Sequence, residues 1–203
     1  MPLLTTGAGK YPAASVATTT WNPADKDANI GLTGGNLTAT KTGDGASVVR
    51  SVASRSSGLY YYEITFSVFT GSFSGVGIAN GTASLSAFMG SDVNACIWLS
   101  DGRVYVNNSN FTNIQSWAQG DTLCTSFDAT NKLIWFRTNG GNWNNSGAAN
   151  PATGTGGIDL AANGLAAGPY LASIQTWLDT NASTANFGAT TYAQTAPSGF
   201  GNW

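Results

Sequence analysis

The stretch from Trp117 to Gly140 constrains the fold of this sequence more than any other. Leu123 and Phe127 share one face of a first strand, and after the polar connection 128–131 every residue of the run 133–136 is apolar. The pattern predicts an antiparallel hairpin, because Asp and Asn in the connection bond to nearby backbone and tolerate left-handed torsions. A second strand that is apolar on both faces needs cover on both faces. We therefore expect further layers of structure on each side of this hairpin.

The length of 203 residues allows one domain with a sizeable core, and all-β sandwiches of this size commonly form single units. Residues 1–19 are small, weakly patterned and rich in Ala, Thr, Ser and Gly. We expect them to form an extended N-terminal arm that orders only against another surface. The domain is expected over residues 20–203, where Trp21 is an aromatic anchor followed by turn residues.

Short strand patterns separated by turn residues recur through this domain. Residues 58–68 alternate most clearly, with one core face and a second face that is partly apolar. Gly75 and Gly77, inside a strand pattern, predict close approach of another backbone or of an aromatic side chain from a facing strand. Asp101-Gly102 between apolar runs predicts a hairpin with positive φ at both residues.

The remaining expected strands are short and evenly spaced. Residues 83–92 read as a loop with one helical turn around Leu85 to Met89. The first three strands in the series below are expected to form an antiparallel meander. The strands are 30–32, 36–42, 47–53, 73–79, 94–99, 103–107, 169–176 and 183–187. Together with the near absence of helical periodicity, they predict an all-β, two-sheet antiparallel β-sandwich.

The composition disfavours two classes of partner. Only 9% of residues are charged, against about 25% in an average soluble protein. Eight Lys and Arg, spread singly, provide no basic stripe, so nucleic acid is not expected as a partner. No apolar run approaches the roughly 18 residues of a membrane-spanning helix, and the start lacks the features of a secretory signal. We expect no membrane association and synthesis in a cytoplasm.

The inventory of reactive side chains disfavours an enzyme. Histidine is absent, which removes the commonest general base and the commonest metal ligand. A glycanase needs two carboxylates about 5 to 10 Å apart, but Glu63 is the single glutamate and is expected to accept backbone or tyrosine hydrogen bonds. Asp121 and Asp128 lie at hairpin ends and are expected to be turn or capping groups. We expect no catalytic residue and no cofactor.

Metal binding and a disulfide are both disfavoured. Asp25 with Asp27, or Asp92 with Asn94, could offer oxygen ligands to calcium, but neither pair forms a recognisable calcium loop. Cys96 and Cys124 each lie inside an apolar strand pattern. Two buried thiols are favoured over a disulfide, since a core of this size needs no cross-link.

The motifs, taken in order, resemble the SPRY domain, a concanavalin A-like jelly roll that serves as a protein-interaction module. They cover roughly residues 21 to 200. Any one of these motifs is a weak signal, but seven of them in the order of the family are specific for it. The matching segments are Gly58–Phe66, Gly75–Ala79, Asp101–Tyr105, Trp117–Asp121, Phe127–Gly140, Pro169-Tyr170, and Asn186–Gly188 with Pro197–Phe200.

The low charge, the Thr/Ala/Gly arm and the Ser/Thr/Asn-rich surface depart from eukaryotic members and resemble SPRY-type proteins of bacteriophages and prophages. This resemblance implies a virion surface protein, such as a decoration, fibre-associated or tail-associated protein, made in the cytoplasm of a bacterial host. Residues 1–19 would then attach to other virion proteins. A homo-oligomer would be in keeping with this class, since virion parts are usually symmetric.

Candidate binding residues are aromatics in expected loops among Asn, Ser and Gly. Rigid aromatics beside adaptable amides are common in protein and sugar recognition. The alternative is that each aromatic caps one end of the core. The long loop 139–168, which carries Trp143, is the first place to expect a partner. A lectin-like module that binds host-surface glycans through this loop is the alternative function. The candidates are Phe73, Phe88, Phe111 and Trp143, with Asn110, Asn142 and Asn144.

Overall fold

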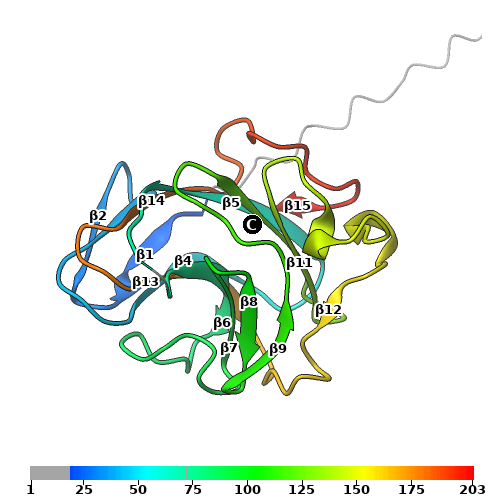
Figure 1. Cartoon of the computed structure of the whole chain (residues 1–203), viewed down its shortest axis with the longest axis horizontal. Helices are drawn as coiled ribbons and strands as arrows, with labels where there is room; N and C mark the ends of the chain where they lie inside the picture. Colours follow the sequence, from blue (N-terminus) through cyan, green and yellow to red (C-terminus); the bar gives the residue numbers. More distant parts are fainter. Residues whose placement is uncertain (1–18, 72) are drawn as a thin grey trace, which may run out of the picture.

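The computed structural model describes residues 19–71 and 73–203, and their architecture is all-β. Two sheets pack against each other as a sandwich (Figure 1). The described residues contain only two helical segments, the 3₁₀ turns η1 (Trp143–Asn145) and η2 (Pro151–Thr153). The two-sheet antiparallel sandwich expected from the sequence is confirmed. None of the described helices is long and apolar enough to cross a membrane.

Sheet A has seven strands in the spatial order β1-β4-β13-β6-β7-β8-β9. Each pair of neighbours is antiparallel. The strands are β1 (Trp21–Lys26), β4 (Ser47–Arg55), β6 (Gly75–Asn80), β7 (Ala95–Leu99), β8 (Arg103–Val106), β9 (Ser109–Asn113) and β13 (Tyr170–Thr176).

Sheet B has the order β12-β11-β10-β5-β14-β3-β2, and the short strand β15 pairs with β5 in parallel. The strands are β2 (Ile30–Thr33), β3 (Thr38–Lys41), β5 (Leu59–Val68), β10 (Thr122–Asp128), β11 (Leu133–Thr138), β12 (Ile158–Asp159), β14 (Ala182–Asn186) and β15 (Gly201–Asn202).

The expected meander of the first strands is wrong. β2 and β3 pair in sheet B, but β4 crosses to sheet A and pairs with β1 and β13. The first five residues of β4, Ser47 to Ser51, are buried, so this strand requires neighbours on both edges and cover on both faces. The segment Trp21–Lys26, expected to be an aromatic anchor followed by turn residues, is an irregular edge strand that tolerates Pro23.

Two tight turns differ from expectation. In Ser100–Gly102 only Gly102 has positive φ (93°), which is the pattern of a three-residue hairpin loop rather than of a two-residue turn. Asn107 and Asn108 do both have positive φ, at 51° and 55°. They connect β8 to β9, an edge strand that is not among the strands expected from the sequence.

The hairpin of β10 and β11 forms as expected, with Leu123 opposite Thr138 and Asp128 opposite Leu133. Ile134 and Phe136 face the main core between the sheets, whereas Trp135 lies in a separate cluster on the outer face of sheet B. The prediction that β11 is covered on both faces is confirmed.

Gly75 and Gly77 in β6 allow two close approaches. A Cβ on either glycine would collide with a carbonyl oxygen of β7, that of Trp98 or of Cys96. From the facing sheet, Tyr62 Oη donates a hydrogen bond to the carbonyl oxygen of Gly77 over 2.6 Å. Both the backbone and the aromatic approach expected from the sequence are confirmed.

Both ends of the described domain contact β4. The Oγ1 atom of Thr19 accepts a hydrogen bond from the Ala53 N–H (2.9 Å), so this last residue of the expected arm is a buried part of the domain. Trp203, fully buried, donates from Nε1 to the Ala53 carbonyl oxygen (3.1 Å) and to Ser51 Oγ (3.0 Å). The rest of the arm, residues 1–18, lies outside the described residues.

Candidate binding surface

The face of sheet A that points away from sheet B carries its own apolar cluster. Val48, Ile97 and Leu99 from this face pack against Met89 of the loop 81–92. The loop is tied to the sheet by a hydrogen bond from the Val48 N–H to the Leu85 carbonyl oxygen (2.8 Å). The helical turn expected around Leu85 to Met89 does not form. The loop is therefore a covering segment held by side-chain packing and by hydrogen bonds to the sheet.

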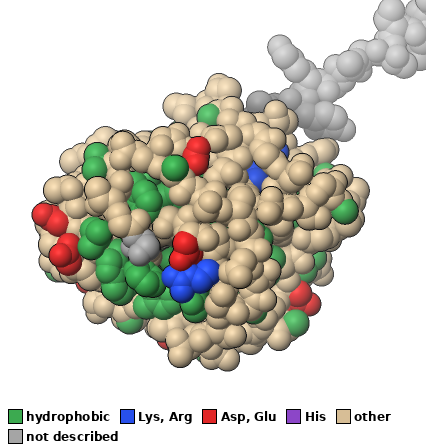
Figure 2. Space-filling model, in the orientation of Figure 1, with side chains coloured by type: hydrophobic (Ala, Val, Ile, Leu, Met, Phe, Trp, Pro, Cys, Tyr) green, Lys and Arg blue, Asp and Glu red, His purple; other side chains and the backbone are tan. Residues whose placement is uncertain are grey.

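Four aromatic side chains meet at the edge of this cluster and form what we call the aromatic patch: Phe73, Phe88, Tyr105 and Trp177. The ring centroids of Phe73 and Trp177 are 5.2 Å apart, and those of Phe88 and Tyr105 are 5.3 Å apart. Phe73 links the two pairs, since it lies 6.5 Å from Phe88. Phe73 is 37% exposed and the other three are partly exposed. Figure 2 shows hydrophobic side chains gathered on one side of the molecule beside a basic and an acidic side chain.

Arg103 supplies a cation at the centre of the aromatic patch. Its guanidinium carbon lies 5.4 Å from the Phe73 ring centroid and 5.5 Å from that of Tyr105. Nη1 donates to Tyr105 Oη over 2.9 Å, and Nε donates to Asp101 Oδ2 over 2.7 Å. The cation is thus oriented by one carboxylate while its central carbon lies over two aromatic rings.

The ion pair also sets the protonation of Asp101. Partial burial favours the neutral acid, but the hydrogen bonds and the charge of Arg103 outweigh this effect and hold the pKa of Asp101 below its ordinary value. The same hydrogen bond raises the pKa of Arg103. Both side chains are about a third exposed (31% and 39%), so solvent screens the pair and its contribution to stability is small.

Gln175 holds two of the aromatic residues in place. Its side chain, fully buried, donates from Nε2 to the carbonyl oxygen of Phe73 and accepts at Oε1 from the N–H of Met89, the neighbour of Phe88. Ser74 Oγ accepts a hydrogen bond from the N–H of Trp177 (3.1 Å). A buried amide in β13 therefore connects two of the segments that carry the patch, those of Phe73 and Phe88.

Trp143, a sequence candidate, lies elsewhere and is only 9% exposed. Its ring packs on the outer face of sheet B with Cys124 and Trp135. The ring centroid of Tyr61 lies 6.4 Å away, and the Arg137 guanidinium carbon lies 4.2 Å above the Trp143 ring. The indole therefore covers the outer face of β11 and leaves no open ring face for a sugar.

The two asparagines beside Trp143 differ in their environment. Asn144 Oδ1 accepts from the Phe136 N–H (2.9 Å), while Nδ2 donates to the carbonyl oxygens of Gly156 (2.9 Å) and Ile134 (3.3 Å). The Asn144 side chain thus makes hydrogen bonds to the backbone at the edge of β11 that a neighbouring strand would otherwise make. Asn142 is exposed and makes no side-chain cap to the 3₁₀ turn.

Phe111 and Asn110 lie in the edge strand β9 and not in a loop, contrary to expectation. Phe111 is partly buried and packs against the main core. The structure therefore brings together only Phe73 and Phe88 of the seven sequence candidates.

The patch residues that the sequence reasoning missed are Tyr105, Trp177 and Arg103. A signal existed for the strand β8, where Arg103 and Tyr105 alternate with the buried Val104 and Val106. Such alternation places the arginine and the tyrosine side by side on the outer face. Trp177 directly follows β13, and nothing local in the sequence connects it to Phe73.

The carboxylates have the structural roles expected. Glu63, 3% exposed, accepts hydrogen bonds from Tyr61 Oη (2.7 Å) and from the N–H groups of Ala193 and Gln194 (both 2.8 Å). This confirms the expected backbone and tyrosine contacts of Glu63.

The two aspartates of the hairpin are turn and capping groups, as predicted. Asp121 accepts from Asn139 Nδ2 (2.8 Å). Asp128 Oδ1 accepts from the N–H groups of Thr130 and Asn131 (both 2.9 Å).

The side-chain oxygens of the two residue pairs considered for calcium already take part in other ion pairs and hydrogen bonds. Asp25 pairs with Arg50, whereas Asp27 accepts from Ser47 Oγ (2.9 Å). Asp92 accepts from both the backbone N–H (2.8 Å) and Nδ2 (3.1 Å) of Asn94. Over residues 19–71 and 73–203, no three His, Cys, Asp or Glu side chains gather where they could hold a metal ion.

Both cysteines are free and buried, which confirms the preference for thiols over a disulfide. Cys96 faces the main core and Cys124 the outer cluster of sheet B. Burial raises the pKa of Cys124 to about 11 and raises that of Cys96 as well. Neither thiol is a thiolate near neutral pH.

No protein-family model and no curated protein matches the sequence. Among solved structures, the SPRY domain of human HERC1 is similar, with a TM-score of 0.65 and 13% sequence identity. The similarity covers 84% of this chain and 99% of the HERC1 chain. At this identity the likeness concerns the fold alone. The chain therefore has a SPRY-type β-sandwich fold, as the order of its motifs had indicated.

Proposed function

We propose that this chain is a non-enzymatic binding module that contacts a protein partner through the aromatic patch. The observation that carries the proposal is the exposed Phe73 beside Trp177, with Arg103 between Phe73 and Tyr105. Tryptophan, tyrosine and arginine are the residues that most often dominate protein interfaces. Gln175 fixes the backbone of Phe73 and of Met89, the neighbour of Phe88, and Ser74 fixes that of Trp177. These fixed positions lower the entropy lost on binding.

The chemistry of the described side chains supports binding over catalysis. Glu63 is buried and already accepts three hydrogen bonds. The cysteine thiols are protonated near neutral pH because burial raises their pKa. With no histidine in the sequence, neither a hydroxyl nor a thiol has its usual base.

Binding through the patch is tested with two variants. The partner is unidentified, so the probe is a fluorescently labelled full chain applied to bacterial host cells. Phe73→Ala combined with Trp177→Ala should reduce saturable adhesion at least about tenfold, because hot-spot truncations cost more than 1 kcal/mol each. The matched control is Val68→Ala, a 40% exposed residue of sheet B. Equal loss in the control, or unchanged adhesion in the double variant, would contradict the role of the patch.

We further propose that the module belongs to the surface of a phage or prophage virion and is attached by residues 1–19. Support comes from the uncharged polar surface, with only 9% charged residues, and from the Ala/Thr/Ser/Gly composition of the arm. Deletion of residues 1–18 should abolish incorporation into particles and leave the thermal transition of the domain unchanged. Thr19 is kept in this variant because it bonds to Ala53. Normal incorporation of the truncated chain would refute attachment through the arm.

A lectin is the second candidate, because the partly exposed rings of Phe73 and Trp177 could stack on a sugar. The buried Trp143 no longer favours the loop 139–168 for this role. A glycan array separates the two candidates. Saturable sugar binding that is lost in Trp177→Ala would support the lectin, whereas adhesion that disappears after protease treatment of the cells would support a protein partner. An assay for released reducing ends tests the remaining class, a glycanase.

A further inference from the structure

A second concave site lies on the outer face of sheet A, and it is separate from the aromatic patch. Its volume is about 570 Å³, and none of its lining residues belongs to the patch. Its apolar part consists of Val52 on β4, Leu171 on β13 and Pro169. Val52 is 57% exposed, more than any other large hydrophobic side chain among the described residues. An outward, exposed valine on a sheet face marks a place where an apolar group could be buried.

The rim of this pocket is polar and is held by an amide network. Asn80 Nδ2 donates to Asn94 Oδ1 over 3.0 Å. Thr82 Oγ1 lies 2.7 Å from Asn80 Oδ1 and 3.0 Å from Asn94 Oδ1, and its single proton can serve only one of them. Asn80 Oδ1 also accepts from the Thr82 N–H (2.9 Å), so the two amide oxygens together retain capacity for one further hydrogen bond. Ser54 Oγ lies on the same rim and is exposed.

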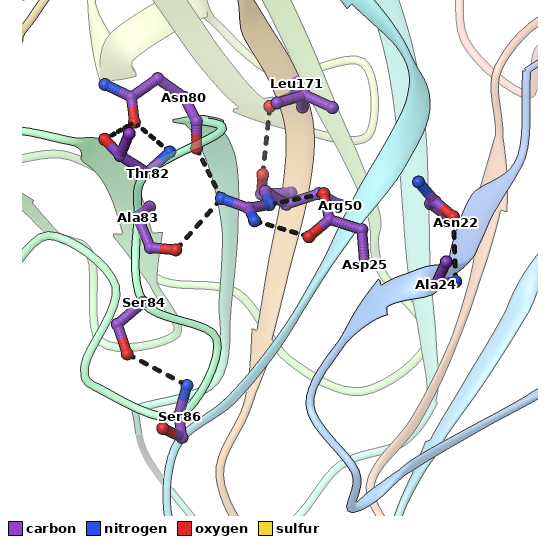
Figure 3. Close-up of polar contacts among 11 residues, drawn as sticks. Asn22, Ala24, Asp25, Arg50, Asn80, Thr82, Ala83, Ser84, Ser86 and Leu171 are labelled. Carbon is purple, nitrogen blue, oxygen red and sulfur yellow. Dashed lines mark hydrogen bonds and ion pairs between the residues drawn. The ribbon is translucent and has the colours of Figure 1, made fainter.

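The charge that faces the pocket is negative. Arg50 Nε donates to Asp25 Oδ2 (2.9 Å), and Nη1 donates to the carbonyl oxygens of Asn80 (2.6 Å) and Ala83 (3.1 Å), as Figure 3 shows. The Arg50 side chain is 6% exposed, but that of Asp25 is 24% exposed. Asp25 is the single charged residue among those lining the pocket. The guanidinium therefore lies beneath the surface while the carboxylate remains open to solvent.

The pocket is also rigid before any ligand binds. The N–H of Asn80 donates to the Asn94 carbonyl oxygen (2.8 Å), and the N–H of Ala166 donates to that of Val93 (2.7 Å). Arg50 also joins Asp25 to the carbonyl oxygens of Asn80 and Ala83. Together these bonds fix the walls of the pocket. Binding therefore requires little ordering of the protein.

An aliphatic floor below a rim of acceptor oxygens and one carboxylate suits a side chain with an apolar stem and a cationic end. We propose that this pocket binds a lysine side chain presented by a protein partner. The stem packs on Val52 and Leu171, and the ammonium donates to Asp25, to an amide oxygen of the rim and to Ser54 Oγ. Lysine has three donors on one compact centre, which matches oxygens that come from separate residues.

Other occupants fit the pocket less well. Arginine prefers to pair with both oxygens of one carboxylate, and Arg50 already occupies both oxygens of Asp25. A neutral aliphatic side chain would cover Asp25 without a compensating donor. A sugar would find no aromatic ring among the lining residues on which to stack.

The pocket is tested on the full, isotope-labelled chain by NMR titration with acetyl-Gly-Lys-Gly-amide. We expect saturable chemical-shift changes at the N–H groups of Val52 and Asn94. The same peptide with norleucine in place of lysine should bind at least about fivefold more weakly, because it keeps the stem and lacks the charge. Equal binding of both peptides, or no shift with the lysine peptide, would overturn the proposal.

A substitution that introduces a cationic side chain into the pocket provides a matched variant. Val52→Lys, at an exposed position, should place an ammonium in the pocket and weaken peptide binding at least about tenfold. Val68→Lys on β5 is the control and should bind like the wild type. If Val52→Lys fails to fold, Ser54→Lys replaces it. Asp25→Asn is avoided because it leaves Arg50 buried without its counter-charge. Persistent binding in the lysine variant would refute the site.

The pocket and the aromatic patch can be distinguished in the same assay. The double variant Phe73→Ala/Trp177→Ala should bind the lysine peptide normally, even though its adhesion to cells is lost. Loss of peptide binding in this variant would place the lysine contact at the patch and contradict the assignment to the pocket.

Discussion

Tyr61 Oη donates a 2.7 Å hydrogen bond to Oε1 of Glu63, two residues further along the same strand. Both side chains point away from the main core, and both are nevertheless buried. The carboxylate also accepts the N–H groups of Ala193 and Gln194, so it fastens the segment that precedes the C-terminal strand to β5. A single acidic side chain thus holds together two parts of the chain that are about 130 residues apart.

The substitution Glu63→Gln should lower the free energy of unfolding by about 1–3 kcal/mol, because the new amide group would face N–H donors. Urea unfolding followed by tryptophan fluorescence measures the change. Asp159→Asn is the control, since that carboxylate is exposed and accepts from Ala162 in a loop. If both variants lose equal stability, the buried contacts of Glu63 are not the cause.

The buried tyrosines should make the fold sensitive to alkali. Burial raises the pKa of Tyr61, Tyr62 and Tyr192, and the nearby Glu63 raises it further for Tyr61 and Tyr192. Because the folded state holds these protons more tightly than the unfolded state, stability is complete below about pH 10, the ordinary value for tyrosine, and falls above it.

Two measurements check this expectation. Absorbance at 295 nm should show that three of the seven tyrosines ionise only when the protein unfolds. The urea midpoint should be constant between pH 7 and 9 and decrease between pH 10 and 11. A midpoint that stays level to pH 11 would disagree with the raised pKa values.

Gly77→Ala should destabilise the sandwich by about 1–3 kcal/mol or more, because overpacking in a tight site forces backbone to move. The new Cβ would collide with the Cys96 carbonyl oxygen in β7. Gly81→Ala is a matched control, since no atom lies within 4 Å of its added Cβ and its φ is not positive. Thermal unfolding of the pair provides the comparison, and equal midpoints would rule out the close approach of β6 and β7.

Cys96 and Cys124 should be unreactive in the folded protein. With both thiols buried, and the pKa of Cys124 near 11, dithiobis(nitrobenzoate) at pH 8 should release no colour from the native state. In guanidinium chloride, both thiols should react within minutes. Fast reaction of one native thiol would mean that its strand opens readily, and mass spectrometry would identify which one.

The sequence was most informative where alternation was strong. The regular pattern of β5 and the apolar run of β11 predicted their strands, and the need for cover on both faces of β11 was evident from its composition alone. The sequence could not show that Trp143 provides this cover, because the contact is between side chains of separate segments. A tryptophan in an asparagine-rich loop has the same local signature whether it binds a ligand or packs on a sheet.

The candidate site was predicted only in part for a related reason. Phe73 and Phe88 were recognisable as aromatics outside the strands. Their meeting with Trp177 depends on Gln175, whose amide bonds to segments 86 and 102 residues away along the chain. Such long-range contacts produce no periodic pattern in the sequence. The crossover of β4 to the other sheet was missed for the same reason, since local patterns do not reveal which strands become neighbours.

The two ends of the described domain meet at Ala53, whose N–H bonds to Thr19 and whose carbonyl oxygen bonds to Trp203. The main core therefore lacks one of its largest side chains until residue 203 has been synthesised. Until Trp203 has docked, the surfaces of Tyr62 and Phe127 that it covers stay exposed. Packing of the main core is thus completed by a side chain far along the chain from the strand that it bonds, so these contacts belong to the late, non-local steps of folding.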